Sequence, residues 1–190
     1  MSPNRTVTLR DCALVLGLVA ATLLTLWVMG RLPLCACGTV KFWFGPVNSN
    51  ETSQHLSDWY SLSHVIHGFL FFGALWLLLR NGSLGARLAL AVGIEGAWEI
   101  FENTSLVIER YRTSTMSLDY YGDSIVNSFG DLASMILGFM IASRLPVWLT
   151  VLVGVGMEVL AGLVIRDNLT LNIIMLAYPL EFIKQWQMGL

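Results

Sequence analysis

Long uninterrupted runs of apolar residues are the main pattern along this chain. The first run covers residues 13–29 and contains no charged residue, and the second covers residues 62–79. A helix needs roughly 20 apolar residues to cross the hydrocarbon core of a bilayer, and segments of about 17 to 25 residues are tolerated. Both runs are therefore predicted to be transmembrane helices.

Further apolar runs follow, but they contain ionisable residues. Three of them cover residues 84–104, 123–143 and 147–165. A last piece, residues 169–183, is short and includes Pro179, so it is either a sixth crossing or a helix that enters the membrane only partway. The pattern predicts an all-α polytopic transmembrane helix bundle of five to six spans, forming a single domain over residues 1–190.

Composition supports a membrane protein and excludes several soluble classes. Hydrophobic residues make up 55% of the chain and charged residues only 13%, whereas a soluble domain has about 25% charged residues. The mean hydropathy is +0.66. A formal net charge of -2 provides no basic field for a polyanion, so a nucleic-acid partner is not expected. Membrane lipids are the expected partners, and the sequence names no protein partner.

The positions of Lys and Arg favour a cytoplasmic N-terminus. Arg5, Arg10 and the other basic residues on that side lie in short segments close to the ends of the spans, where positive charge has the most influence on orientation. The reverse orientation stays open because the counts on the two sides are close. A cleaved signal peptide is the other alternative, but Arg31 and Pro33 separate the first apolar run from any cleavage-like sequence, which favours a retained helix.

Three cysteines carry little information about chemistry. Cys12 falls at the start of the first span, and Cys35 and Cys37 lie in the loop that follows it. A disulfide across a single intervening residue is geometrically tight, so all three are expected to be free thiols.

Polar residues within the spans are the candidates for function, because an ionisable group at membrane depth is costly unless it is paired or hydrated. Glu95, Glu99, Glu102 and Asn103 project from one side of a helix, within an arc of about 100°. A second stripe repeats every four residues in the next span. It consists of Asp123, Asn127 and Asp131, with the small residues Gly130, Ser134 and Gly138 on the same side.

Successive spans cross the membrane in opposite directions, so these polar groups are expected at one depth, near the outer ends of the helices. His64 and His67 start the second span, and the two acidic stripes lie at the same level. The predicted polar pocket also includes Glu95, Asn103, Asn127, Glu158, Arg166, Asp167, Asn168 and Asn172.

Two imidazoles and several carboxylates form a ligand set for a divalent metal such as zinc, magnesium or manganese. His64, His67, Asp123 and Asp131 are the predicted ligands, with Glu99 or Glu102 as the general base. Such a centre activates water or a substrate for hydrolysis or group transfer on a lipid or cell-envelope substrate. No HExxH or GxSxG motif accompanies these residues.

Two alternatives to a metal-dependent enzyme remain open. Glu95, Glu99 and Glu158 could form the titratable path of an ion- or proton-coupled transporter. The polar groups could instead hold the bundle together, or form the interface of a non-catalytic subunit in a membrane complex.

The segment Val164 to Asn172, which reads VIRDNLTLN and precedes Pro179, resembles a family of uncharacterised bacterial inner-membrane proteins with a domain of unknown function. The residues around Glu95 and Glu99 and the two Gly-Asp pairs at Asp123 and Asp131 are also similar to that family. The resemblance implies a multi-pass protein of the bacterial inner membrane, and it implies no particular activity.

Overall fold

The computed structural model describes residues 6–115 and 117–189. Over these residues the regular structure is helical, apart from one isolated β-bridge between Phe44 and Asp58. The helices are α1 (Leu9–Val28), α2 (Ser61–Leu78), α3 (Leu84–Glu102), α4 (Ser105–Ser114), α5 (Ile125–Ala142), α6 (Val147–Ile165), α7 (Leu169–Ala177) and α8 (Glu181–Met188). The predicted all-α fold is therefore confirmed.

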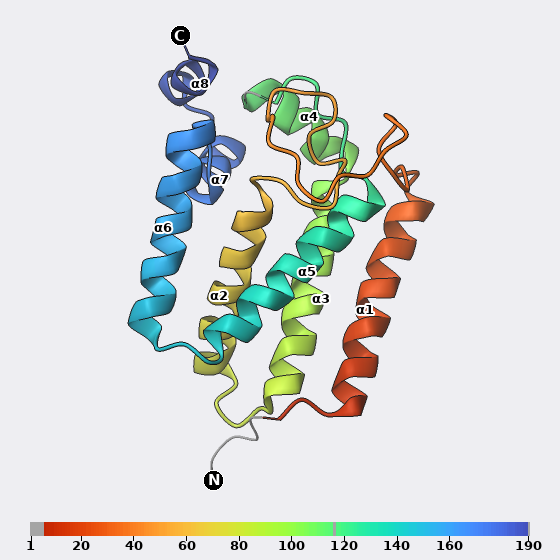
Figure 1. Cartoon of the computed structure of the whole chain (residues 1–190), viewed down its shortest axis with the longest axis vertical. Helices are drawn as coiled ribbons and strands as arrows, with labels where there is room; N and C mark the ends of the chain where they lie inside the picture. The colour runs from red at the N-terminus through yellow and green to blue at the C-terminus, as the bar shows by residue number, and fades with distance from the viewer. Residues whose placement is uncertain (1–5, 116, 190) are drawn as a thin grey trace.

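The long helices lie alongside one another, and the short ones gather at one end of the bundle (Figure 1). We call that end the loop end: it carries α4, α7, α8 and the two long connections, residues 29–60 and 103–124. The opposite end, with the α2–α3 and α5–α6 turns, is the hairpin end.

Helices α1, α2, α5 and α6 are long and apolar enough to cross a membrane. Helix α3 has 19 residues, but Arg87 and three glutamates reduce its apolar character. Helix α7 has only nine residues, or about 14 Å at 1.5 Å per residue, which is too short to cross. The expected count of five to six spans is thus not confirmed, and the orientation is untested; Arg5, which contributed to it, lies outside the described residues.

Cap residues set the helix boundaries. The Thr8 hydroxyl accepts a hydrogen bond from the Asp11 N–H, and the Asp11 carboxylate accepts one from the Thr8 N–H, so both ends of a capping box are present at α1. Ser124 caps α5 through the Asn127 N–H. Arg166 ends α6 in a left-handed conformation, with φ of 56°.

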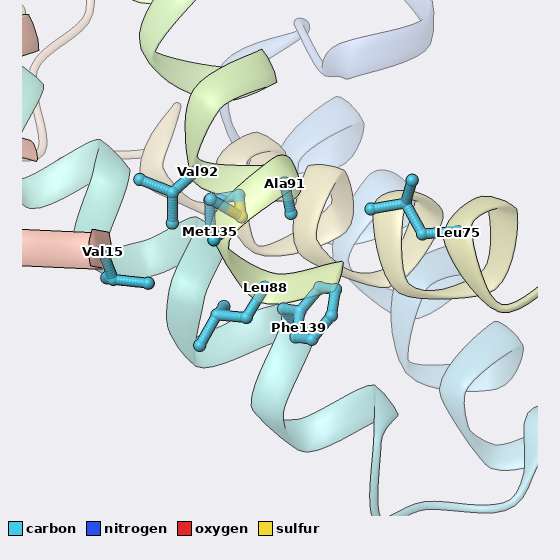
Figure 2. Close-up of a cluster of buried hydrophobic side chains, with 8 residues drawn as sticks. Val15, Leu75, Leu88, Ala91, Val92, Met135 and Phe139 are labelled. Carbon is cyan, nitrogen blue, oxygen red and sulfur yellow. The ribbon is translucent and has the colours of Figure 1, made fainter. Parts of the chain in front are cut away.

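The hairpin half of the bundle is filled by an apolar core. Val92, Met135 and Phe139 are fully buried at its centre, and Leu88 and Leu75 pack around them (Figure 2). These side chains come from α2, α3 and α5, and Val15 adds a contact from α1. The histidines and acidic residues of the same helices lie in the other half, toward the loop end, while the buried Arg87 of α3 donates to the carbonyls of Leu79 and Arg80 in the α2–α3 turn.

Helices α2 and α5 cross in close contact because each presents a glycine at the crossing. A Cβ added at Gly68 would overlap the carbonyl oxygen of Met135, and one added at Gly138 would overlap the carbonyl oxygen of Val65. Small residues allow backbones to approach in this way. Gly130 similarly lies against the carbonyl of Leu56, so the small-residue side of α5 faces protein.

The cysteines at the loop end differ from expectation. Cys35 and Cys37 are joined in a disulfide, so the expectation of free thiols is wrong for this pair. The turn that ends at Gly38, whose φ is 78°, brings the two sulfurs together across Ala36. Cys12 is free and exposed, as expected.

The glycine crossing predicts a strong effect of adding one methyl group. Gly68→Ala and Gly138→Ala should each destabilise the fold by about 1 to 3 kcal/mol, because overpacking forces two backbones apart. Thermal unfolding in detergent measures the effect. Gly73→Ala is the matched control on α2, since a Cβ there meets nothing within 4 Å. Equal melting temperatures for Gly68→Ala and Gly73→Ala would contradict the proposed packing constraint.

Candidate functional site

Two histidines and one glutamate form the centre of a polar cluster between α2 and α3. His64 Nδ1 lies 2.6 Å from Glu95 Oε1, and His67 Nδ1 lies 3.1 Å from both Glu95 oxygens. His64 and His67 share a helix face because they are three residues apart. Glu95 is fully buried, and the three side chains place ligand atoms within 4.8 Å of one another.

A second set of acidic groups surrounds His64. Its Nδ1 lies 3.6 Å from Glu99 Oε1, and its Nε2 lies 3.8 Å from Asp131 Oδ2. Asp131 also accepts a hydrogen bond of 3.0 Å from the Ser61 hydroxyl. Ligand atoms of His64, Glu99 and Glu102 form another group within 4.8 Å. His64 is thus common to both groups.

Glu99 is the least satisfied residue of the cluster. Its side chain has no exposed surface, and neither carboxylate oxygen has a hydrogen-bond partner among the described residues. Buried polar groups are nearly always hydrogen-bonded, and a buried charge without a partner is expensive. Glu99 therefore requires either a proton or a cation near His64.

Glu102 connects the cluster to α4 and α7. The Tyr111 hydroxyl lies 2.6 Å from Glu102 Oε1 and 2.8 Å from Asn172 Oδ1. A hydroxyl has a single proton to donate, so Tyr111 cannot donate to both oxygens at once. The Tyr111 hydroxyl therefore donates either to Glu102 or to Asn172 at the cavity wall.

Asp123 is held by Asn103, which the sequence predicts to lie in the same pocket, and by Tyr120, which the sequence did not single out. Asn103 Nδ2 donates to Asp123 Oδ2 at 2.8 Å, and the Asp123 N–H donates to Asn103 Oδ1 at 2.8 Å. The Tyr120 hydroxyl donates to the other carboxylate oxygen at 3.0 Å. Asp123 is therefore fixed by its own partners, apart from the His64–His67–Glu95 centre.

Asp58 joins the site although sequence reasoning missed it. Its carboxylate accepts the N–H groups of Ser53 at 3.2 Å and Tyr60 at 2.8 Å, and its own N–H donates to Ser61 Oγ. Burial raises the pKa of Asp58 to about 6. An aspartate just ahead of an apolar run is a helix-start signal, which could have identified it. No comparable signal marks Tyr60, Tyr111 or Tyr120.

These groups surround a cavity of about 390 Å³, within the range of small-molecule sites. One part of its wall is polar and another is apolar. The polar residues include Tyr60, His64, His67, Glu95, Glu102, Tyr111, Tyr120, Asp123, Asp131 and Asn172. The apolar residues are Leu70, Phe71, Ile94, Trp98, Leu169 and Ile173. Glu99 lies behind this wall, next to His64.

Several predicted pocket residues have other roles. Asn127 donates to the carbonyl of His55 at 2.9 Å and holds the loop over the bundle. Glu158 accepts from the Leu169 and Thr170 N–H groups and caps α7. The predicted site residues that the structure leaves outside the cavity wall are Glu99, Asn103, Asn127, Glu158, Arg166, Asp167 and Asn168.

Asp167 anchors the C-terminal helices. Its carboxylate accepts hydrogen bonds from Tyr60 at 3.1 Å, from Gln187 at 3.0 Å and from the Asn168 N–H at 2.9 Å. Arg166 donates to the carbonyl of Trp186 at 3.0 Å. Contacts from α2, α7 and α8 therefore converge on this turn after α6.

Fold and site together define an all-helical protein with apolar, membrane-length helices and a buried histidine–carboxylate cluster at one end. The chain belongs to the family described as protein of unknown function (DUF2585), whose model matches residues 26–189.

Curated relatives carry the family name UPF0314. A UPF0314 protein of Rhizobium etli is 57% identical over 92% of this chain and 90% of its own length. Similar proteins of Paracoccus denitrificans and Agrobacterium fabrum are 53% and 50% identical, over 94% and 100% of this chain and 92% and 96% of theirs. No solved structure matches the chain. The chain is thus a member of an uncharacterised bacterial family with no established activity.

Acidification should stabilise the anchor at Asp167. Burial raises the pKa of Asp167 from 3.8 to about 6, so the folded state binds a proton more tightly than the unfolded state. The unfolding free energy should therefore rise as pH falls from about 7 to 4, by on the order of 3 kcal/mol at most from this group. Thermal unfolding across this pH range measures the change.

Asp167→Asn resembles the protonated form and should remove this group's part of the pH dependence. The control is Asp119→Asn, at an exposed position, which should keep the wild-type slope. Identical slopes in wild type and Asp167→Asn would contradict the assignment.

Proposed function

We propose that this protein is a metal-dependent hydrolase or transferase of the bacterial inner membrane, acting on a lipid or cell-envelope substrate in the loop-end cavity. Its metal ligands are His64, His67 and Glu95, which revises the predicted set by exchanging Asp123 and Asp131 for Glu95. Two histidines and a glutamate, with one position left for water, form a known catalytic zinc set; manganese and magnesium are the alternatives.

The observation that carries this proposal is the carboxylate of Glu99, which is buried without a hydrogen bond and has His64, at 3.6 Å, as its basic neighbour. Five acids, Glu95, Glu99, Glu102, Asp123 and Asp131, lie around two imidazoles, and the described residues that line the cavity include no Lys or Arg. Removing so many carboxylates from water costs several kcal/mol per ion unless positive charge is present. A divalent cation at the His64–His67–Glu95 centre supplies that charge and can activate water.

Glu102 is the proposed general base. It lines the cavity and has a hydroxyl partner in Tyr111, whereas Glu99 lies behind the wall. Glu99 then acts as a positioning residue, whose charge strengthens the metal centre through His64. Asp131 has the same relation to the other ring nitrogen of His64.

The arrangement of the bundle supports a pocket that opens at one end. The apolar core of Val92, Met135 and Phe139 fills the hairpin half, where a transporter would need polar groups. We propose α3 as a fifth crossing and a cytoplasmic N-terminus, so that the loop end faces outward. The disulfide at the loop end supports this orientation, because disulfides persist in oxidising compartments.

Metal content is the first measurement. Purified protein supplied with zinc, manganese or magnesium should hold about one ion per chain by elemental analysis. His67→Gln and the isosteric Glu95→Gln should weaken binding by at least about 10- to 100-fold, the loss that removing only an outer-shell partner of a ligand causes. Glu181→Gln, at the exposed start of α8, is the control. A folded wild type without stoichiometric metal under every supplied ion would sink the metal assignment.

The two candidate bases are separated by a second measurement. Glu102→Gln should keep the metal but lower turnover of a chromogenic acyl ester by about 10²- to 10⁴-fold, the usual contribution of a general base. Glu99→Gln should instead weaken metal binding, because it removes a neighbouring negative charge. Glu109→Gln on α4 is the control for both. Full activity of metal-loaded Glu102→Gln would show that another group is the base.

A further inference from the structure

The apolar wall of the cavity has a specific position in the fold. Leu70 and Ile94 lie near the midpoints of α2 and α3, and their side chains are 57% and 41% exposed at the surface of the bundle. Ile173 of α7 is also exposed, at 55%. We call the space between these three residues, together with Phe71 and Trp98, the side passage; it is continuous with the polar cavity.

The depth of the side passage indicates what surrounds it. At the middle of a membrane-length helix the environment is lipid hydrocarbon. Leu70 is six residues beyond His64 on α2, or about 9 Å along the helix axis. A molecule that enters between Leu70 and Ile94 from the hydrocarbon region therefore reaches the level of His64 after about 9 Å along the helix axis.

The charges of the cavity restrict the polar end of such a molecule. Its ionisable wall residues are two histidines and the carboxylic acids Glu95, Glu102, Asp123 and Asp131. These four carboxylates outnumber the two positive charges of one divalent cation, so an anionic head group would still be repelled, while hydroxyl groups can donate hydrogen bonds to the carboxylates. The tyrosine hydroxyls at the same end offer further polar partners.

We propose that the cavity binds a single acyl lipid with an uncharged, hydroxyl-bearing head group, with the acyl chain leaving through the side passage. This inference rests on the proposed function for the reaction at the head group, but lipid binding is measured separately from metal and turnover. The lipid reaches the site laterally from the bilayer, and its head group stops beside His64 and His67.

Binding is tested with four probes on delipidated protein as purified, with its metal content measured separately, by native mass spectrometry. 1-Oleoylglycerol should be retained at one molecule per chain. Methyl oleate has the same acyl chain without hydroxyls, and it should bind at least about tenfold more weakly, which corresponds to the loss of one or two hydrogen bonds. Oleate is anionic and should bind at least as weakly as methyl oleate. Glycerol should not be retained. Equal retention of 1-oleoylglycerol and methyl oleate, or no retention of either, overturns the proposal.

Variants test the route. Leu70→Trp and Ile94→Trp fill the side passage and should reduce 1-oleoylglycerol retention about tenfold or more, while metal content stays at the wild-type level. Leu163→Trp is the matched control, because Leu163 is 78% exposed on α6, away from the cavity. Equal retention of 1-oleoylglycerol in all three variants overturns the proposal. A lipid-free protein that is a dimer, and that becomes a monomer in Leu70→Trp, also overturns it, because a second copy of the chain would then cover the side passage.

Trp98 provides a measurement that needs no packing variant. The fluorescence of Trp98 is the difference between wild type and Trp98→Phe. A monoacylglycerol with a dibrominated acyl chain should quench this fluorescence, because Trp98 borders the side passage. Absence of that quenching in wild type overturns the chain position. A protein that binds 1-oleoylglycerol as described but holds no metal would reject the proposed function and leave this inference standing.

Discussion

The burial of carboxylates beside His64 is the constraint on which the rest of the loop end depends. Glu95 satisfies both of its oxygens with two imidazoles, whereas Glu99 has no hydrogen-bond partner among the described residues. A charge in a medium of low dielectric must be neutralised or compensated nearby. The loops, the tyrosines and α7 line the cavity at this cluster, so their arrangement sets the electrostatics of one small region.

The bundle is divided into two halves with different chemistry along the same helices. Toward the hairpin end, α2, α3 and α5 meet through apolar side chains, and two glycines allow α2 and α5 to cross closely. Toward the loop end, the same three helices carry His64, Glu95 and Asp131. The rigid crossing fixes the axial position of α2 relative to α5, and it thereby fixes the separation of His64 and Asp131.

Much of the fold follows from the sequence, because apolar runs and caps are local signals. The runs that begin near residues 62, 84 and 147 became helices close to the predicted bounds. Residues 169–183 did not form one helix, because the chain breaks around Pro179 into α7 and α8. The disulfide could not be predicted from the sequence, because a bridge across a single residue is geometrically tight in general and the turn that ends at Gly38 is seen only in the structure.

The grouping of the polar side chains could be predicted from the sequence in outline, but their pairing could not. Helical spacing placed His64, His67 and the three glutamates on common faces, and these are the residues that the structure brings together. Periodicity cannot tell which residue on the neighbouring helix faces a given side chain, so it could not distinguish Glu95 from Asp123 as the partner of the histidines. Asp58 and Tyr111 come from loop and short-helix segments whose positions depend on long-range contacts such as those of Asn127 and Asn172.

The short turn between α2 and α3 has a consequence for how the chain enters a membrane. Helix α3 carries three glutamates, so by itself it is a poor candidate for transfer from water into the membrane. The turn joins it directly to α2, so that His64 and His67 lie opposite Glu95 as soon as the two helices pair. Under the proposed topology, α3 can therefore be inserted together with α2 as a pair in which Glu95 already has its two imidazole partners, before α5 has been synthesised. Glu99 gains no hydrogen-bond partner from this pairing.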